Sequence, residues 1–202
     1  MPDLTTSIAT LIIVAALAYL LGAVPFGILI TRALGLGDLR TIGSGNIGAT
    51  NVLRTGHRGA AAATLLLDAA KGAVAVLIAR AMVGEDAAQL AGLAAFLGHV
   101  FSIWLGFKGG KGVATFLGLL TALAPVVGLS CCAVWLATAA ITRISSMSAL
   151  VAAASASLWL VVFNHGQMLF LVMILTLLIY LKHARNIARI KAGTEPKIGA
   201  KS

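Results

Sequence analysis

The chain alternates between long apolar runs and short polar segments. A helix needs about 20 mostly apolar residues to cross a bilayer. The runs at residues 7–31, 59–83, 88–105, 146–162 and 168–180 are therefore predicted to be membrane helices. Residues 1–7 carry one acidic side chain and no lysine or arginine, whereas Arg32 and Arg40 follow the first run. Because basic residues favour the cytoplasmic side, the N-terminus is expected outside.

The apolar stretch between Gly112 and Ile141 allows more than one interpretation. It follows a basic segment and precedes Arg143, so both of its ends favour the cytoplasmic side and an even number of crossings is expected. Pro125 lies near its middle and suits a turn between two helices, 112–124 and 126–142. The predicted fold is then all-α, a polytopic bundle of seven transmembrane helices with a cytoplasmic C-terminus. One tilted helix here would give five or six crossings instead.

Composition supports a membrane protein that forms one domain over residues 1–202. Hydrophobic residues make up 60% of the chain and charged residues 10%, against about 25% charged in soluble domains. The net charge of +9 fits cytoplasmic loops and contact with anionic lipid, and no block of charge indicates nucleic-acid binding. Cys131 and Cys132 lie inside an apolar run, where a metal or disulfide role is not expected.

Three polar segments, 41–54, 106–115 and 182–195, are predicted to lie on the cytoplasmic face and could converge on one site. In the second, Lys108, Gly109, Gly110 and Lys111 combine positive charge with a backbone that can approach a ligand closely. This pattern indicates either an anion site or a charged cytoplasmic turn. It is no P-loop, because glycine replaces the required Ser or Thr after Lys111.

Short hydrogen-bonding side chains are dense in the first polar segment. They form either a capping cluster for the next helix or a cradle for phosphate; these residues are Ser44, Asn46, Thr50, Asn51 and Arg54. The three-glycine pattern of residues 43–48 follows no strand, so a dinucleotide site is excluded. The chain also lacks the G-x-S-x-G motif of serine hydrolases.

Ionisable residues within the apolar runs need partners, because charge at membrane depth is costly. Asp68 and Lys71 are three residues apart and can pair on one helix face, or Asp68 can steady a basic residue of the site. His99 is expected to be a buried supporting histidine. His183, beside Asn186 at the cytoplasmic end of the last helix, is either a buried structural histidine or part of the site. The basic residues of the same segment, Lys182, Arg185, Arg189 and Lys191, either belong to the site or anchor the protein to anionic lipid.

Together these segments resemble the bacterial acyl-phosphate:glycerol-3-phosphate acyltransferases, the PlsY family. The likeness runs from about residue 19 to 195 and lies mainly in three motifs: Ser44-Gly-Asn-Ile-Gly-Ala-Thr-Asn-Val-Leu-Arg54, Gly98-His-Val-Phe with Phe107-Lys-Gly-Gly-Lys-Gly-Val-Ala-Thr115, and Lys182-His-Ala-Arg-Asn-Ile-Ala-Arg189 with Gly193-Thr-Glu195. The sequence departs from the family at Ala184, where a basic residue is usual, and in the looser stretch 142–146.

The resemblance implies transfer of a fatty acyl group from acyl phosphate to glycerol 3-phosphate, giving lysophosphatidic acid and phosphate. It implies a seven-helix enzyme of the bacterial inner membrane, without metal or nucleotide cofactor, and a cytoplasmic active site. We expect a monomer. The implied catalytic residues are Ser44, Arg54, Lys108, His183 and Asn186. The implied substrate-binding residues are Gly45, Asn46, Thr50, Asn51, Gly109, Gly110, Lys111 and Ser146, with support from Asp68, Lys71 and His99.

Two points stay open at this stage. The proton of the attacking hydroxyl can go to His183 or to a phosphate oxygen of the substrate, and the substrate is the favoured acceptor.

A transporter of phosphorylated solutes would share the helices and basic loops. It would need polar residues through the full depth of the membrane, whereas here they gather on one face. A membrane scaffold would leave residues 44–54 without a role.

Overall fold

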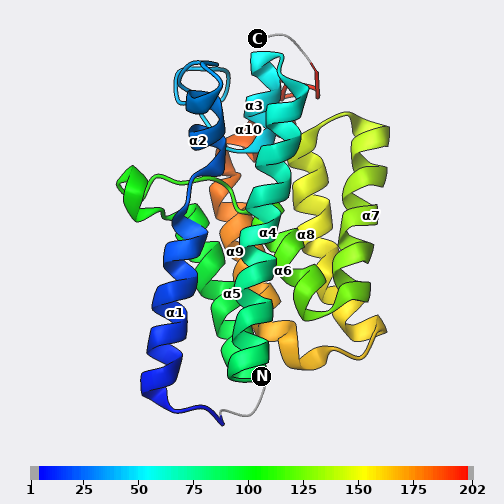
Figure 1. Ribbon diagram of the computed structural model, residues 1–202. Helices are drawn as coiled ribbons and strands as arrows, with labels where there is room; N and C mark the ends of the chain where they lie inside the picture. The colour runs from blue at the N-terminus through cyan, green and yellow to red at the C-terminus, as the bar shows by residue number, and fades with distance from the viewer. Residues whose placement is uncertain (1–4, 200–202) are drawn as a thin grey trace.

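A computed structural model describes residues 5–199 and shows an all-helical bundle (Figure 1). The helices, in chain order, are α1 (Ile8–Ala23), α2 (Phe26–Ala33), α3 (Ala49–Val52), α4 (Arg58–Met82), α5 (Glu85–Val100), α6 (Val113–Leu123), α7 (Pro125–Thr142), α8 (Ser145–Val162), α9 (Leu169–Lys182) and α10 (Ala184–Lys191). Short 3-10 turns lie at η1 (Leu53–Thr55), η2 (Ile103–Leu105) and η3 (Gly166–Met168).

Length and composition identify five candidate membrane spans in this part of the chain. They are Ile8–Ala33, Arg58–Met82, Glu85–Leu105, Pro125–Thr142 and Ser145–Val162; α9 and α10 add a sixth if they count as one span bent by 63°. The eleven-residue α6 is apolar but shorter than a full span. The all-α, multi-pass fold is therefore confirmed. The count of seven crossings stays a prediction.

The stretch 112–142 forms two helices, with Pro125 as the first residue of the second. Proline suits this position because the first N–H groups of a helix have no intrahelical acceptor. The guanidinium of Arg80 donates to the carbonyls of Ala122 and Leu123, at 2.6 and 3.0 Å, and so covers the exposed end of α6. The turn expected near Pro125 is present.

The first membrane segment is broken where the sequence predicted one helix over residues 7–31. Pro25 supplies no N–H and separates α1 from α2. The carbonyls left free at the break are satisfied from other helices: Ser102 Oγ donates to Ala23 O at 2.6 Å, and Lys71 Nζ donates to Val24 O at 2.9 Å. These contacts tie the break to α4 and to the segment after α5.

Small residues allow the helices to approach closely, as is common in membrane bundles. A Cβ added to Gly22 of α1 would collide with the backbone of Ala95 in α5. A Cβ on Gly118 of α6 would collide in the same way with the backbone of Ala69 in α4. The short α6 is therefore held tightly against α4, and its first turn has a fixed place.

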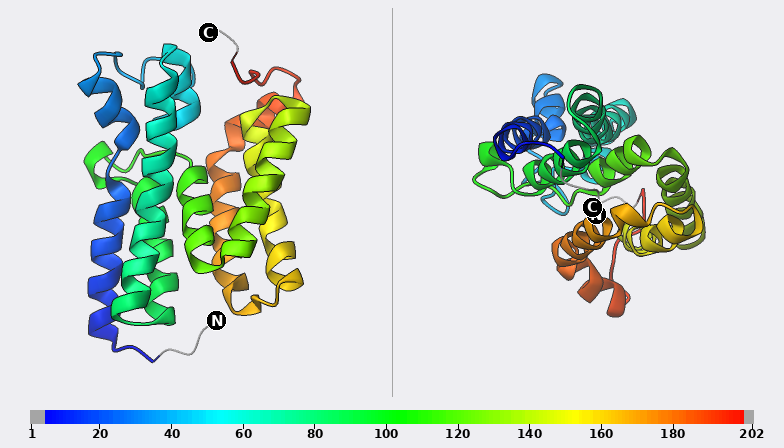
Figure 2. Two further views of the ribbon diagram at one scale, coloured as in Figure 1. Left: turned by 45° about the vertical axis from the view of Figure 1, so that its right-hand side comes forward. Right: turned by 90° about the horizontal axis from the view of Figure 1, so that it is seen from below.

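One end of the bundle, the upper end in Figure 1, carries α2, α3 and α10. The α4–α5 turn and the start of α1 lie at the opposite, lower end. Helix α6 starts at mid-height, descends to the lower end, and is followed by α7, which rises again (Figures 1 and 2). The polar segments 41–54 and 182–195 thus lie at the upper end, and segment 106–115 delivers its last residues to the interior below them.

Candidate functional site

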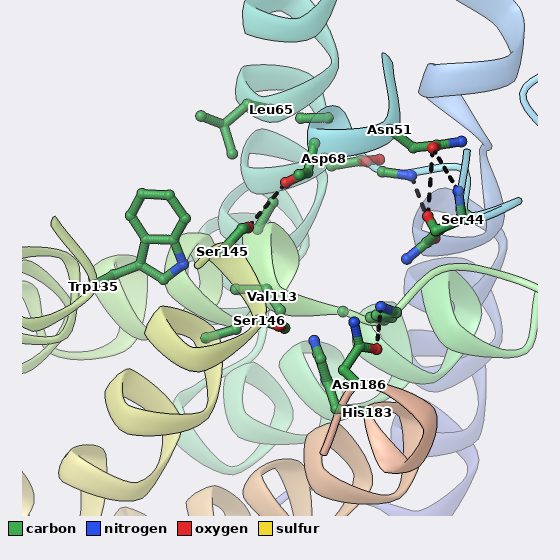
Figure 3. Close-up of a pocket in the computed structure, with 18 of the residues that line it drawn as sticks. Ser44, Asn51, Leu65, Asp68, Val113, Trp135, Ser145, Ser146, His183 and Asn186 are labelled. Atoms are coloured by element: carbon green, nitrogen blue, oxygen red, sulfur yellow. Dashed lines mark hydrogen bonds between the residues drawn. The ribbon is translucent and has the colours of Figure 1, made fainter. Parts of the chain in front are cut away.

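A cavity of about 370 Å³ lies between these segments. Residues from all three predicted motifs line it: Ser44, Asn46, Thr50, Asn51, Arg54, Lys111, His183, Asn186 and Glu195. Ser145 and Ser146 enter it from the start of α8, and Asp68 and His99 lie at its floor. The structure thus brings the three motifs together, as the sequence led us to expect (Figure 3).

Asn51 organises the first motif. Its side-chain Nδ2 donates to the carbonyls of Leu39 and Ile42 at 2.9 and 3.0 Å, and its Oδ1 accepts from the Ser44 N–H at 3.2 Å (Figure 3). Asn51 is buried, so these bonds fix the loop that carries Ser44. The exposed Ser44 hydroxyl is held at the rim, with its oxygen 3.4 Å from Asn51 Oδ1.

Asn186 and Glu195 connect the second and third motifs. Lys111 Nζ donates to Asn186 Oδ1 at 2.6 Å, and Asn186 Nδ2 donates to Glu195 Oε1 at 2.5 Å. Glu195 also accepts from Ser146 Oγ at 2.7 Å and from Arg189 Nε at 2.6 Å. One carboxylate therefore fixes three donors along the cavity wall. Glu195 stands in the third motif of the sequence, but no role was expected for it.

The ionisation of Lys111 and Glu195 follows from these surroundings. Removal from water disfavours the ammonium and lowers the pKa of Lys111 to about 8, although the Glu195 carboxylate opposes this shift. Burial raises the pKa of Glu195, but hydrogen bonds from Ser146, Arg189 and Asn186 outweigh it and hold the pKa below its usual value. Near neutral pH the site therefore holds an ionised Glu195 and a Lys111 cation that loses its charge in moderate alkali.

His183 presents one nitrogen for chemistry. Its Nδ1 lies 2.8 Å from the carbonyl of Ile179. A carbonyl only accepts hydrogen bonds, so Nδ1 carries the proton and the lone pair of the neutral ring is on Nε2. The ring is buried and lines the cavity beside Asn186 (Figure 3). His183 can accept a hydrogen bond, or a proton, from a substrate hydroxyl.

A buried polar group forms the floor of the cavity. The expected pair between Asp68 and Lys71 is present, with Oδ1 and Nζ 2.7 Å apart. His99 Nδ1 lies 3.6 Å from the same oxygen and has no hydrogen-bond partner among the described residues. The other ring nitrogen faces Gly110, where an added Cβ would collide with it. His99 therefore supports the backbone of the second motif from below.

The second motif uses its backbone differently from the prediction. The N–H groups of Gly109 and Gly110 donate to the carbonyls of Val100 and His99, at 3.2 and 3.0 Å. They are therefore occupied in this conformation. Gly112 adopts φ of +84° at the start of α6, and the N–H groups that follow it lack intrahelical acceptors. The backbone N–H groups that are free to meet an anion are then those at the start of α6, where Gly112, Val113 and Ala114 line the cavity.

Three other predicted residues also lie outside the cavity lining. Lys108 is exposed, Lys71 is buried below the floor, and the N–H of Gly45 donates to Ile42 at 2.9 Å. The binding role assigned to Lys108 stays a prediction. No group of three or more His, Cys, Asp or Glu side chains within residues 5–199 is placed to hold a metal ion.

The cavity continues into an apolar arm between α4, α6 and α7. Its walls are Leu65, Leu117, Cys132, Trp135 and Leu136, of which Leu65 and Leu136 are 49% and 63% exposed on the outer surface of the bundle. Figure 3 shows Trp135 and Leu65 on the side away from Ser44, Asn186 and His183. One cavity thus joins a polar, cationic end to an apolar arm that opens towards the membrane.

Comparison with known proteins gives a consistent result. A family model described as glycerol-3-phosphate acyltransferase matches residues 12–193. The glycerol-3-phosphate acyltransferases of Cereibacter sphaeroides and Ruegeria pomeroyi are 64% and 65% identical over 202 residues, which cover all of this chain and 96% and 100% of theirs. The chain is also similar to a crystal structure of PlsY (YgiH), an integral membrane glycerol 3-phosphate acyltransferase, in the glycerol 3-phosphate form. That similarity has a TM-score of 0.89 and 39% identity over 94% of this chain and 96% of that one. The lysophosphatidic acid form gives 0.87 and 38% over the same shares.

Proposed function

Because the chain belongs to the glycerol-3-phosphate acyltransferase family, we propose that it transfers a fatty acyl group from acyl phosphate to the 1-hydroxyl of glycerol 3-phosphate. The products are lysophosphatidic acid and inorganic phosphate. The observation that carries this proposal is the cavity in which a cationic, polar end continues into a lipid-facing apolar arm. Two phosphorylated groups and one acyl chain suit such a cavity.

The polar end offers two places for phosphate. Arg54 can bind one phosphate through its planar fork, beside the fixed Ser44 hydroxyl. Lys111 and the start of α6 can bind the other, combining an ammonium with free backbone N–H groups. We assign the first to acyl phosphate and the second to glycerol 3-phosphate. The acyl chain then lies in the arm beside Leu65 and Trp135.

The reaction requires no enzyme nucleophile, because acyl phosphate is an activated anhydride. The 1-hydroxyl oxygen forms a bond to the acyl carbon, the bond from that carbon to the bridging phosphate oxygen breaks, and phosphate leaves with the electron pair. The hydroxyl proton goes to a phosphate oxygen, which becomes more basic as the bond breaks. Cations and N–H donors held in place stabilise the charge that develops.

We propose that His183 orients the attacking hydroxyl through Nε2, and that the substrate phosphate takes the proton. His183→Gln tests the division of roles, because glutamine can accept a hydrogen bond but is no base. We expect His183→Gln to keep a measurable kcat with an unchanged pH profile. Loss of all turnover in a folded variant, with retained substrate binding, would assign the base to His183.

The enzyme is proposed to work at the cytoplasmic face of the bacterial inner membrane. The test of the proposed function is phosphate release by purified protein supplied with acyl phosphate and glycerol 3-phosphate, and acyl-CoA serves as the comparison donor. We expect phosphate and lysophosphatidic acid in equal amounts from acyl phosphate, and no product from acyl-CoA. Folded protein that releases no phosphate, or that prefers acyl-CoA, would contradict the assigned donor.

A further inference from the structure

A second groove, of about 430 Å³, is lined by residues of α1, α2 and two neighbouring loops and shares no residue with the first cavity. Its lining residues come mainly from the α1–α2 junction and from the segment that holds η2. Figures 1 and 2 show these two parts of the chain side by side. Leu20, Leu29 and Trp104 line it and are 43%, 48% and 62% exposed. The chain belongs to a family of integral membrane proteins. An exposed apolar groove on its helices therefore faces the bilayer.

Two arginines lie at one end of the groove. Arg32 is in the last turn of α2, and Arg40 belongs to the loop that follows. Arg40 is paired with Asp38 through three side-chain bonds, of 3.0, 3.1 and 2.7 Å. Arg32 is exposed and forms no ion pair within residues 5–199, although its charge acts on the nearby Asp38 carboxylate. Two arginines and one aspartate leave one net positive charge at this end.

The order of these features matches the order of groups in a lipid. The arginines are at the upper end of the bundle, where α2 ends, and the apolar walls extend below them along α1 (Figure 1). Trp104 also lines the groove. Its indole has an apolar ring and a polar N–H, and such rings favour the boundary between lipid headgroups and hydrocarbon. In a zwitterionic headgroup, the ammonium offsets the attraction between the phosphate and Arg32. An anionic headgroup has no such positive group and keeps this attraction.

We propose that this groove binds one anionic phospholipid from the leaflet at the upper end of the bundle. Its headgroup phosphate contacts Arg32 and Arg40, and an acyl chain follows Leu29 and Leu20 beside Trp104. The site lies at the α1–α2 break and against the segment that leads to Lys108, so a bound lipid would stabilise the loop that joins the two parts of the second motif. This inference does not depend on the acyl donor or on the assignment of the catalytic residues.

Fluorescence quenching tests the proposal in the full chain. A variant whose only tryptophan is Trp104 (Trp135→Phe, Trp159→Phe) is placed in phosphatidylcholine vesicles with rising fractions of brominated phosphatidylglycerol or brominated phosphatidylcholine. We expect phosphatidylglycerol to quench Trp104 at an about fivefold lower fraction, the preference that one arginine near the surface provides. A second variant that keeps only Trp159, which lies on α8 away from the groove, should show no preference.

Substitution at Arg32 identifies the cause. Arg32→Gln should abolish the preference for phosphatidylglycerol, and Arg32→Lys should restore most of it. Arg58→Gln is the matched control, because Arg58 is also exposed at the upper end but lies outside the groove, and it should keep the preference. Equal quenching of Trp104 by the two lipids would overturn the proposal. So would an equal loss of preference in Arg58→Gln, which would indicate general attraction to the positive face.

Discussion

Lys111 is the residue at which pH should act on the proposed site. Its pKa is lowered to about 8, mainly because it is buried, so its positive charge is lost as the pH rises through that value. If this cation binds the phosphate of glycerol 3-phosphate, kcat/KM for that substrate should be constant between pH 6.5 and 7.5 and fall above pH 8. The measurement is the kcat/KM profile at saturating acyl phosphate.

Two substitutions separate this explanation from others. Lys111→Arg keeps a positive charge in alkali and should remove the fall, even if the rate is lower. Lys111→Met should raise KM for glycerol 3-phosphate by about 50-fold, the loss of a charge-assisted contact worth about 2–3 kcal/mol. Lys191→Met is the matched control, since Lys191 is exposed and outside the cavity. A fall above pH 8 that persists in Lys111→Arg would assign it to another group.

The contact between His99 and Gly110 makes a second prediction. Gly110→Ala would place a methyl group on the ring of His99 and displace the chain that leads to Lys111. We expect KM for glycerol 3-phosphate to rise about tenfold, in line with about 1–3 kcal/mol for overpacking. His99→Ala in the same chain creates the space and should restore part of the loss. Double-mutant kinetics measure this coupling, and additive effects would show that His99 does not support Gly110.

Several site residues were predictable from the sequence because they carry the chemistry in their own side chains. The family resemblance implied Arg54, His183 and Asn186, whose side chains carry charge or hydrogen-bonding groups, and all three line the cavity. The use of backbone N–H groups was not predictable, because a glycine-rich motif does not reveal which carbonyls its N–H groups meet. The contacts of Glu195 were not predictable, because they depend on how the C-terminal tail folds. The tail is held in place by a hydrogen bond from Ile198 N to Arg143 O, at 2.7 Å.

Among the elements, α6 depends most on close packing. Gly118 faces the backbone of Ala69 in α4, so Gly118→Ala should push α6 away from α4 and shift its first turn, which lines the cavity. We expect a destabilisation of about 1–3 kcal/mol together with reduced activity. Thermal unfolding in detergent and the phosphate-release assay measure the two effects. Gly166→Ala is the control, because nothing lies within 4 Å of a Cβ there.

The elements differ in how far the sequence determined them. Long apolar runs predicted α4, α7 and α8 to within a few residues, because length and hydropathy alone decide such helices. The apolar run 7–31 predicted one helix, yet two separate helices result on either side of Pro25. Donors from Lys71 and Ser102 stabilise the free carbonyls there. That stabilisation comes from residues far along the chain, so no local pattern could predict it.

At the scale of the whole molecule, the direction of the chain through the membrane is the main property still to be measured. The start of α1 and the helix α10 lie at opposite ends of the bundle, which requires an odd number of crossings if both ends reach water (Figure 1). Five full-length spans, the bent α9–α10 pair and the short α6 together give that odd number. The upper end also carries Arg32, Arg40, Arg54 and Arg58, and basic residues favour the cytoplasm.

Labelling of single cysteines tests this orientation directly. Cys131 and Cys132 are first replaced by alanine, and one cysteine is introduced at Gly35 in the upper loop or at Gly166 between α8 and α9. A Cβ would meet nothing within 4 Å at either glycine. Gly35 has φ of +65°, which strains a cysteine there, so phosphate release by that variant is measured before it is labelled. In intact cells a membrane-impermeant maleimide should label the cysteine at position 166 and reach position 35 only after lysis.

The reverse pattern would place the cavity outside, where an enzyme that depends on acyl phosphate from the cytoplasm would have no donor. Labelling of both positions in intact cells would require an even number of crossings between them, and so would contradict α4, α5, α6, α7 and α8 as five passes.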